Sequence, residues 1–280
     1  MRLSTPLLFF VLALMTLVLS GCVHAPAGSA GANAPKLSAW AGFPPVEWVR
    51  PESSQIKTLT APTQAWGHAP LPNKKNTAYT YAVSEGRAAL KASAVSSASM
   101  LRQPLRVGAA ELGVLRFAWK VPALIARADL SQRELHDTPA RVMLVFEGDR
   151  SKFSAKNAML SELAHALTGE PLPYATLSYV WCNDCKPYAT ITNPRTDRIR
   201  EIPLESGPAS LGRWVDYERD IVKDFTSAFG EAPGALLAVG IMTDTDNTGG
   251  SAEAWYGRVS VVSPAQVQRP ALKVPVKLAE

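Results

Sequence analysis

The chain has 280 residues, of which 47% are hydrophobic and 19% are charged, and its formal net charge is +5. This balance is ordinary for a globular protein and provides enough residues for one large domain or two small ones. The Lys and Arg residues are scattered and form none of the runs that mark nucleic-acid binding. We therefore expect no nucleic-acid partner.

The N-terminus is typical of an exported protein. Arg2 precedes an uncharged apolar run from Pro6 to Leu19, which is shorter than the roughly 20 residues of a transmembrane helix. The run ends in Leu-Ser-Gly-Cys22, which resembles the lipobox of bacterial lipoproteins, where the cysteine is lipidated and becomes the new N-terminus. We predict a signal peptide over 1–21 and acylation, including palmitate, at Cys22. Cleavage near Ala30 without lipidation is the alternative.

The lipobox also predicts where the protein resides. Several acyl chains on Cys22 would anchor it to a membrane, so the membrane is the first expected partner. Val23 follows the cysteine in place of an acidic retention residue. By resemblance, this favours the outer membrane, with the protein facing the periplasm.

Three further segments flank or precede the main domain. Residues 22–38 are rich in Ala, Gly, Pro and Ser and predict a flexible, lipidated tether. Residues 39–74 predict an irregular Trp/Pro-rich segment packed on the domain, because its large aromatics would otherwise be exposed. These aromatics are Trp40, Phe43, Trp48 and Trp66. Residues 263–280 predict a loose C-terminal tail.

Residues 75–262 read as one domain of short strands separated by turn residues. The predicted strands are 79–83, 88–94, 114–121, 141–146, 176–181, 189–192, 198–204, 214–220, 235–242 and 253–262. Apolar residues at helical spacing over 154–167 predict one inserted helix, ended by Gly169, and Asp224–Phe229 suggests a shorter one. This pattern predicts a mainly β fold, an antiparallel β-sandwich with one inserted helix.

The pair Cys182 and Cys185 lies in a Trp-Cys-x-x-Cys-Lys sequence like that of thioredoxins. Strand-like residues follow it, not the helix that would lower a thiol pKa. We therefore predict a disulfide closed by a tight hairpin turn at Asn183-Asp184. A redox site and a zinc site are the alternatives, although the four histidines show no metal-ligand spacing.

An Asp-rich loop runs from Asp244 to Gly250. Asp244, Asp246 and Asn247 alternate oxygen-bearing side chains that suit a calcium-like cation, although the loop is shorter than a full calcium-binding loop. The alternative is a turn whose side chains bond their own backbone. We otherwise expect no cofactor.

Aromatic and charged residues recur on neighbouring predicted strands. They are Trp119, Tyr179, Trp181, Trp214, Trp255 and Tyr256, with Asp137, Arg141, Arg219 and Asp220 nearby. Such a mixture is typical of sugar-binding surfaces, and the alternative is that the aromatic residues belong to the core. The sequence contains no nucleophile elbow, phosphate-binding loop or dinucleotide fingerprint.

Seven segments together resemble a bacterial family known as domain of unknown function 3047. They are Leu115–Val121, Ala128–Leu130, Asp137–Val142, Leu177–Trp181, Phe229–Gly234, Ile241–Thr248 and Ala254–Gly257. The resemblance covers about residues 75–262. It implies an exported jelly-roll sandwich similar to galactose-binding and carbohydrate-binding-module folds, and it implies no established activity.

The leading hypothesis is a non-catalytic binding lipoprotein of the cell envelope, with a glycan or peptidoglycan as the possible ligand. Its candidate ligand-binding residues are Asp137, Arg141, Tyr179, Trp181, Asp244, Asp246, Asn247 and Trp255. One alternative is a polysaccharide hydrolase with Asp137, Asp244 or Asp246 as acid or base. Another is a structural or assembly factor that contacts an envelope protein.

Overall fold

The computed structural model describes residues 44–49 and 66–264. Every described residue belongs to one compact unit, which falls within residues 35–280. The predicted signal peptide, Cys22 and the tether lie outside the described residues, as do the tail residues after Pro264. Among the helices that are described, none is long and apolar enough to cross a membrane.

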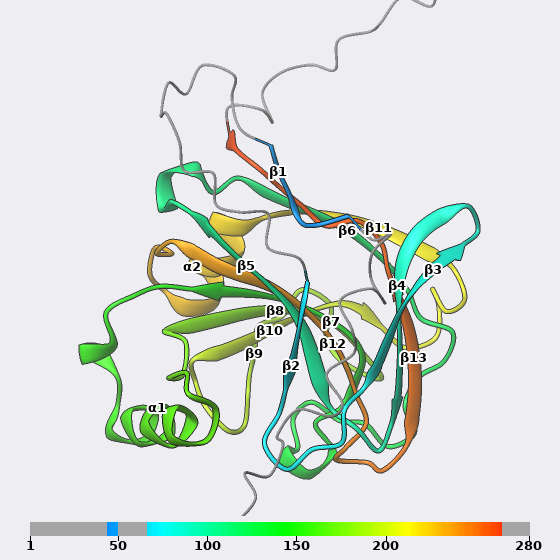
Figure 1. The fold of residues 1–280 in the computed structure, drawn as a ribbon, viewed down its shortest axis with the longest axis horizontal. Coiled ribbons are helices and arrows are strands. Elements are labelled where there is room, and N and C mark those ends of the chain that lie inside the picture. Colours follow the sequence, from blue (N-terminus) through cyan, green and yellow to red (C-terminus); the bar gives the residue numbers. More distant parts are fainter. Residues whose placement is uncertain (1–43, 50–65, 265–280) are drawn as a thin grey trace, which may run out of the picture. The chain divides into compact units, whose positions relative to one another are not determined.

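Two seven-stranded sheets make up the described fold (Figure 1). Sheet A has the order β1-β14-β6-β13-β4-β3, and β11 pairs with β6. Its strands are β1 (Glu47–Val49), β3 (Ala78–Ser84), β4 (Arg87–Val95), β6 (Val114–Lys120), β11 (Trp214–Asp220), β13 (Ser251–Tyr256) and β14 (Ser260–Val262).

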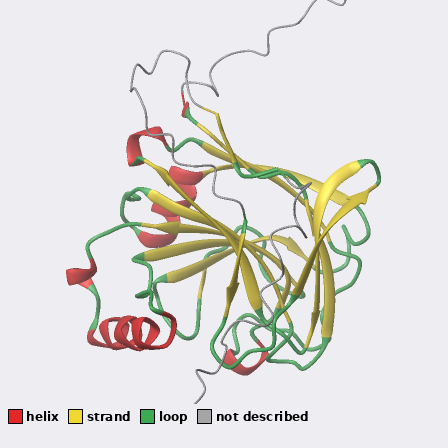
Figure 2. Cartoon of the chain, in the orientation of Figure 1, coloured by secondary structure: helices red, strands yellow, loops and turns green. Residues whose placement is uncertain are grey.

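Sheet B has the order β2-β5-β12-β7-β8-β10-β9. Its strands are β2 (Gly67–Pro70), β5 (Ser99–Val107), β7 (Thr138–Phe146), β8 (Ala175–Cys182), β9 (Ile191–Thr192), β10 (Ile199–Ser206) and β12 (Leu236–Asp244). Two α-helices accompany the sheets (Figure 2): α1 (Ala155–Thr168) connects β7 to β8, and α2 (Ile221–Phe229) connects β11 to β12.

These elements confirm the predicted mainly β sandwich. The hairpin β3–β4 turns at Glu85 and Gly86, whose φ angles of 53° and 75° suit a tight hairpin turn. Ser154 caps α1 by accepting from the Asn157 amide, and Gly169 ends it in the left-handed region at φ 77°. The short helix suggested over Asp224–Phe229 is α2, which begins three residues earlier, at Ile221, and is ended by Gly230.

Several details differ from the sequence expectation. β5 was not predicted, because Pro104 interrupts its pattern, and the pairing register with β12 shifts beside this residue. Residues 253–262 form two strands that both pair with β6. The sheets also contain two parallel pairs, β1–β14 and β8–β10, within an otherwise antiparallel fold. The segment expected to be irregular contributes β1 and β2.

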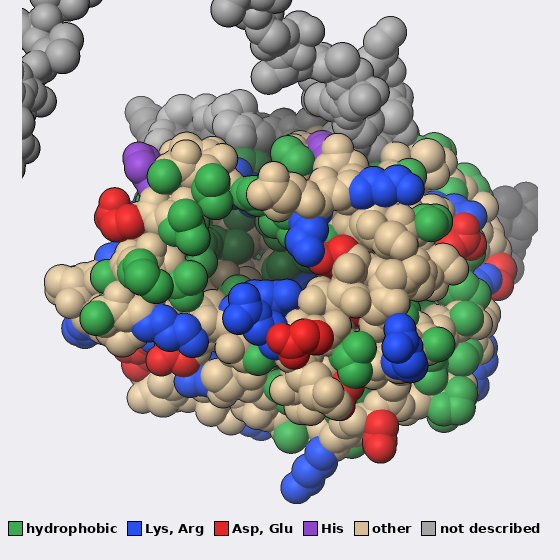
Figure 3. All heavy atoms as spheres, turned by 90° about the horizontal axis from the view of Figure 1, so that it is seen from below, with side chains coloured by type: hydrophobic (Ala, Val, Ile, Leu, Met, Phe, Trp, Pro, Cys, Tyr) green, Lys and Arg blue, Asp and Glu red, His purple; other side chains and the backbone are tan. Residues whose placement is uncertain are grey.

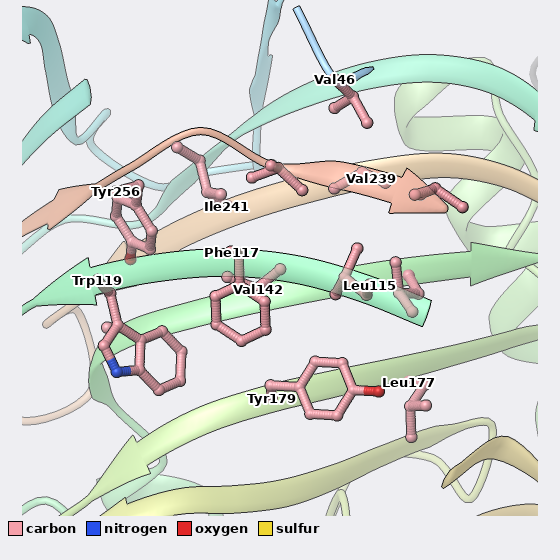
Figure 4. Packing of buried hydrophobic residues seen from close by; sticks show 14 of the residues in the cluster. Val46, Leu115, Phe117, Trp119, Val142, Leu177, Tyr179, Val239, Ile241 and Tyr256 are labelled. Carbon is pink, nitrogen blue, oxygen red and sulfur yellow. The ribbon is translucent and has the colours of Figure 1, made fainter. Parts of the chain in front are cut away.

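The core fills the space between the inner faces of the sheets. β6 alternates, so that Leu115, Phe117 and Trp119 point inward, where they meet Tyr179 of β8 (Figure 4). Phe117 stacks on Tyr179 with ring centroids 5.8 Å apart. Trp66 is also buried, with 2% exposure. The outer faces of the sheets are therefore the surfaces left for a ligand.

Candidate functional site

Two predicted ligand-binding residues belong to the core instead. Tyr179 and Trp181 are both 0% exposed. The Tyr179 hydroxyl donates to Asp224 Oδ2 at 2.9 Å, and Trp181 Nε1 donates to the Gly207 carbonyl at 3.1 Å. Their rings and polar atoms are satisfied inside the protein, so the hypothesis that they contact a ligand is wrong. Every residue of β8 is buried, so the aromatic residues on this strand pack inside the protein.

Arg141 points to the outer face of sheet B but is buried there. Val142 and Leu144 enter the core, so their neighbour on β7 faces the opposite way. Arg141 is 5% exposed and forms an ion pair with Glu201 of β10, which is 0% exposed. His136 Nε2 lies 2.9 Å from the other Glu201 oxygen.

The negative charge of Glu201 is stabilised by its contacts with Arg141 and His136. Burial acts to raise the pKa of Glu201, but the Arg141 guanidinium and His136 outweigh it and hold this pKa below its usual value. Glu201 is therefore ionised, and the pair is fully formed at neutral pH. A buried pair of this kind is costly to break on one side, since the remaining charge loses its partner. Arg141 thus has a structural role, because its ion pair joins β7 to β10 on the outer face of sheet B.

Asp137, Asp244 and Asp246, all candidate site residues from the sequence, come together in the structure. Each offers a carboxylate oxygen, and these oxygens lie within 4.8 Å of one another. They meet because β7 and β12 run antiparallel with Asp244 opposite Thr138, which follows Asp137 in the chain. We call these three residues the acidic cluster.

Asp137 uses its carboxylate to hold the loop between β12 and β13. Its Oδ1 accepts from the Asn247 amide at 3.2 Å, and its Oδ2 accepts from the Thr248 amide at 2.7 Å. The Asn247 side-chain amide donates to the Arg133 carbonyl at 2.9 Å. The loop is thus bonded to the segment before β7 as well as to its own backbone, and Asn247 is not a member of the acidic cluster.

The other two cluster carboxylates also have protein partners. Asp246 forms an ion pair with Lys74, and Asp244 accepts from the Thr138 amide at 3.3 Å. Asp244 Oδ2 lies 3.7 Å from Arg141 Nη2. Three carboxylates suit a hard cation, but such a cation would have to take the place of the Lys74 ammonium. Calcium binding stays a prediction.

The burial of the acidic cluster bears on the hydrolase hypothesis. Asp137 and Asp244 are 1% and 4% exposed. A glycoside hydrolase needs its two carboxyl groups in a cleft that admits the substrate and a water molecule. The acidic cluster is therefore better explained as a set of contacts that joins the segment before β7 to the β12–β13 loop than as a catalytic acid–base pair.

Cys182 and Cys185 form the predicted disulfide, with their Cα atoms 6.1 Å apart. The expected hairpin is wrong, because β9 pairs with β10 and the latter separates it from β8. Cys182 is 3% exposed and packs with Leu130 and Val180 on the outer face of sheet B. The chain continues from Cys182 into bends and turns, so this thiol does not lie at a helix N-terminus.

Trp255, in contrast, stands on the outer face of sheet A. Its neighbours Ala254 and Tyr256 are buried, and it is itself half-buried. The strand pairing places it in a row that crosses β11, β6, β13 and β4. We call the four residues of this row, which are Trp214, Lys120, Trp255 and Lys91, the tryptophan row.

Each indole of the tryptophan row has at least one cation close to its ring. Lys91 Nζ and Lys120 Nζ lie 5.0 and 5.8 Å from the centre of the Trp255 ring. The Arg87 guanidinium lies 5.4 Å from the centre of the Trp214 ring. Because one strand separates the two tryptophans, their Cα atoms are about 10 Å apart. The row thus presents two aromatic surfaces with polar groups between them.

A groove with a volume of about 1010 Å³ adjoins the tryptophan row. Its floor includes Ala118 and Gly257, and a Cβ added at this glycine would lie 3.5 Å from the Trp214 ring. Arg87, which lies over Trp214, also lines the groove and forms an ion pair with Asp216 at 2.8 Å.

A second ion pair, Arg116–Glu218 at 2.6 Å, stands on the groove wall. The groove and row therefore form one continuous surface with aromatic, cationic and anionic groups. Trp214 was predicted only as one of a wider set of aromatic residues, and Arg87, Lys120 and the groove were not predicted. The alternation of β6 and β11 could have predicted that Lys120 and Trp214 point away from the core. Only the pairing register of the strands shows that the two residues are neighbours on one face.

Three comparisons place this chain among known proteins. The family model DUF3047, a protein of unknown function, matches residues 64–260. No curated protein matches the chain. Among solved structures, a CBM29-2 mutant, a family 29 carbohydrate-binding module, matches with 14% identity and a TM-score of 0.25, covering 68% of this chain and 78% of that one.

A second solved structure is the xyloglucanase domain of NopAA, a type three effector from Sinorhizobium fredii, in complex with cellobiose. It matches with 9% identity and a TM-score of 0.36, covering 71% of this chain and 98% of that one.

Substitutions of Trp181 and Trp255 test the assignment of Trp181 to the core and of Trp255 to the outer face of sheet A. Trp181→Ala should lower the free energy of unfolding by about 3–5 kcal/mol, since it leaves a large cavity in the core. Trp255→Ala should change it by less than about 1 kcal/mol, since the indole is half-buried at the surface. Urea denaturation of both variants measures the difference. Equal losses would contradict the assignment.

The acidic cluster predicts a pH dependence of stability. Burial, with Asp137 and Asp246 adding to it against the opposing Arg141, raises the pKa of Asp244 to about 7. The folded protein therefore holds a proton that the unfolded chain has released, and this stability is lost as the pH rises from the usual Asp pKa toward and through 7.

Asp244→Asn imitates the protonated form and removes this effect. The stability of the variant relative to wild type should rise by about 2–3 kcal/mol between about pH 5 and pH 8, as measured by urea denaturation at both values. Asp216→Asn, on the exposed edge of the groove, is the matched control and should show little pH dependence. A relative stability of Asp244→Asn that is flat or falls with pH would refute the raised pKa.

Proposed function

Because this chain belongs to the DUF3047 family, which is described only as a protein of unknown function, we propose its function from its own surface: a non-catalytic glycan-binding module of the cell envelope. The observation that carries the proposal is the tryptophan row beside the groove. Indole rings stack on the apolar faces of sugar rings, and charged side chains bond their hydroxyl groups. A groove of about 1010 Å³ has the size of a ligand site.

The arrangement of polar groups supports an extended ligand. Trp214 and Trp255 lie on different strands with Lys120 between them. Two rings separated in this way can each contact a different sugar unit of one chain. Arg87 and Asp216 extend the polar contacts along the groove. This ion pair and the Arg116–Glu218 pair already hold donors and acceptors in place, which lowers the entropic cost of binding.

We further propose that the protein is a lipoprotein, lipid-anchored through Cys22 to the outer membrane and facing the periplasm. The support is the sequence of the first 22 residues. In this location a peptidoglycan or another envelope glycan would be within reach of the groove. The proposed acylation and the proposed glycan binding are independent of each other and have separate tests.

Binding to peptidoglycan sacculi and to a panel of soluble polysaccharides tests the glycan proposal. We expect the wild type to bind at least one of them, and Trp214→Ala or Trp255→Ala to weaken this binding by about ten-fold or more, which corresponds to about 1–2 kcal/mol. Affinity electrophoresis and pull-down with sacculi measure the effect.

Tyr81→Ala is the matched control for these variants. Tyr81 is 40% exposed and lies on β3 of the same sheet, outside the tryptophan row. Binding should survive its loss. Failure of the wild type to bind any glycan would sink the proposal, and binding that persists in the Trp214/Trp255 double variant would place the ligand elsewhere.

The lipid proposal predicts a defined mass for the N-terminus. In a bacterial host, the mature chain should begin at Cys22 and carry both a diacylglyceryl group and an amide-linked acyl chain, measured by mass spectrometry. Cys22→Ser should lose these groups and no longer fractionate as an acylated outer-membrane protein. An unmodified mature chain that begins near residue 30 would contradict the proposal.

A further inference from the structure

Helix α1 is attached to the sandwich through polar contacts. The residues that it buries are Asn157 and Ser161. The Asn157 side-chain amide donates to Asp197 Oδ1 at 2.6 Å, and the Thr196 hydroxyl donates to Asn157 Oδ1 at 2.8 Å. Just after the helix, Glu170 forms a two-armed ion pair with Arg102 of β5. The large apolar residues of α1 are therefore not what fixes the helix to the domain.

Three of those apolar residues form an exposed stripe along α1. Met159, Leu163 and Leu167 are 64%, 51% and 57% exposed, and they make up three of the seven exposed large hydrophobic side chains of the described residues. Their spacing of four places them on one side of the helix. Figure 3 shows hydrophobic side chains gathered on the left of this face, the side where α1 lies in Figure 1, beside a hollow.

Exposed basic side chains stand at the N-terminal end of the stripe. They are Arg150, Lys152 and Lys156, and none of them forms an ion pair within the described part of the chain. Lys156 precedes Met159 by three residues and lies on the same side of α1. The helix N-terminus adds a partial positive charge at this end. The surface thus combines exposed apolar side chains with positive charge, two features that favour contact with an anionic bilayer.

We propose that this face of α1 is a contact surface for an anionic phospholipid bilayer. Met159, Leu163 and Leu167 enter the boundary between headgroups and acyl chains, while Arg150, Lys152 and Lys156 contact the headgroup phosphates. The proposal rests on the membrane location proposed above, because a lipid anchor at Cys22 keeps the domain at the bilayer surface.

The size of the stripe favours a bilayer over a protein partner. Met159 to Leu167 extends about 12 Å along the helix axis. A stable protein interface covers about 800 Å² on each partner, which a stripe of this length does not supply. A bilayer sets no such minimum, since a weak second contact adds to a covalent anchor. The contact would fix the orientation of the domain on the membrane.

Fluorescence of a probe on the stripe tests the contact. In the mature, acylated protein Cys22 is blocked and Cys182 is bonded to Cys185, so Leu163→Cys provides one free thiol for an environment-sensitive fluorophore. His165→Cys, which is exposed on the opposite side of α1, is the matched control. Both proteins are reconstituted into vesicles of phosphatidylcholine alone or mixed with phosphatidylglycerol.

We expect the probe at residue 163 to brighten several-fold in the phosphatidylglycerol vesicles and to be quenched by spin-labelled lipid, with neither change at 165. The additional changes Lys152→Glu and Lys156→Glu should abolish the preference for phosphatidylglycerol. Equal spectra at 163 and 165 would overturn the proposal, as would a signal at 163 that arises without lipid through association of two copies. Mass measurement of the Cys22 peptide in the same sample separates this failure from failure of the lipid anchor.

Discussion

Trp119 of sheet A and Trp181 of sheet B meet in the space between the sheets, with ring centroids 6.3 Å apart, and the fold depends on this contact and its aromatic neighbours. Phe117 and Tyr217, which also belong to sheet A, pack against Trp119. Each ring removes a large apolar surface from water, which is the main favourable term in folding. Because the rings must point inward, the alternation of each strand determines which residues reach the outer faces.

This constraint explains how much of the fold could be predicted. The hairpin of β3 and β4 and the helix α1 follow from local signals, namely a Glu85-Gly86 turn and a Ser154 cap. β5 escaped prediction because Pro104 interrupts its alternation, and the strand is stabilised by pairing with β12 on one side and β2 on the other. The parallel pairing of β8 with β10 arises from contacts between segments that no local pattern describes.

The candidate site was predictable only in part, for a related reason. A sequence shows that Trp181 and Trp255 both lie on strands, but not that β8 is covered on both faces while β13 leaves one face open. The sequence offered Asp137, Asp244 and Asp246 as candidates but left open whether they converge. The structure brings them together, and their partner Lys74 comes from a segment without strand or motif signals. Likewise, the apolar spacing of α1 predicted a helix and gave no warning that Leu163 and Leu167 would face outward.

The position of β12 in sheet B has a consequence for how the chain acquires its structure. This strand comes late in the sequence, at Leu236–Asp244, yet it lies in the centre of the sheet between β5 and β7. A chain that emerges N-terminus first cannot close sheet B until β12 has arrived. Until then, the edges of β5 and β7 that will pair with it are open and prone to wrong pairing. Closure of sheet B must therefore await the delivery of β12, with the slow kinetics of long-range strand pairing.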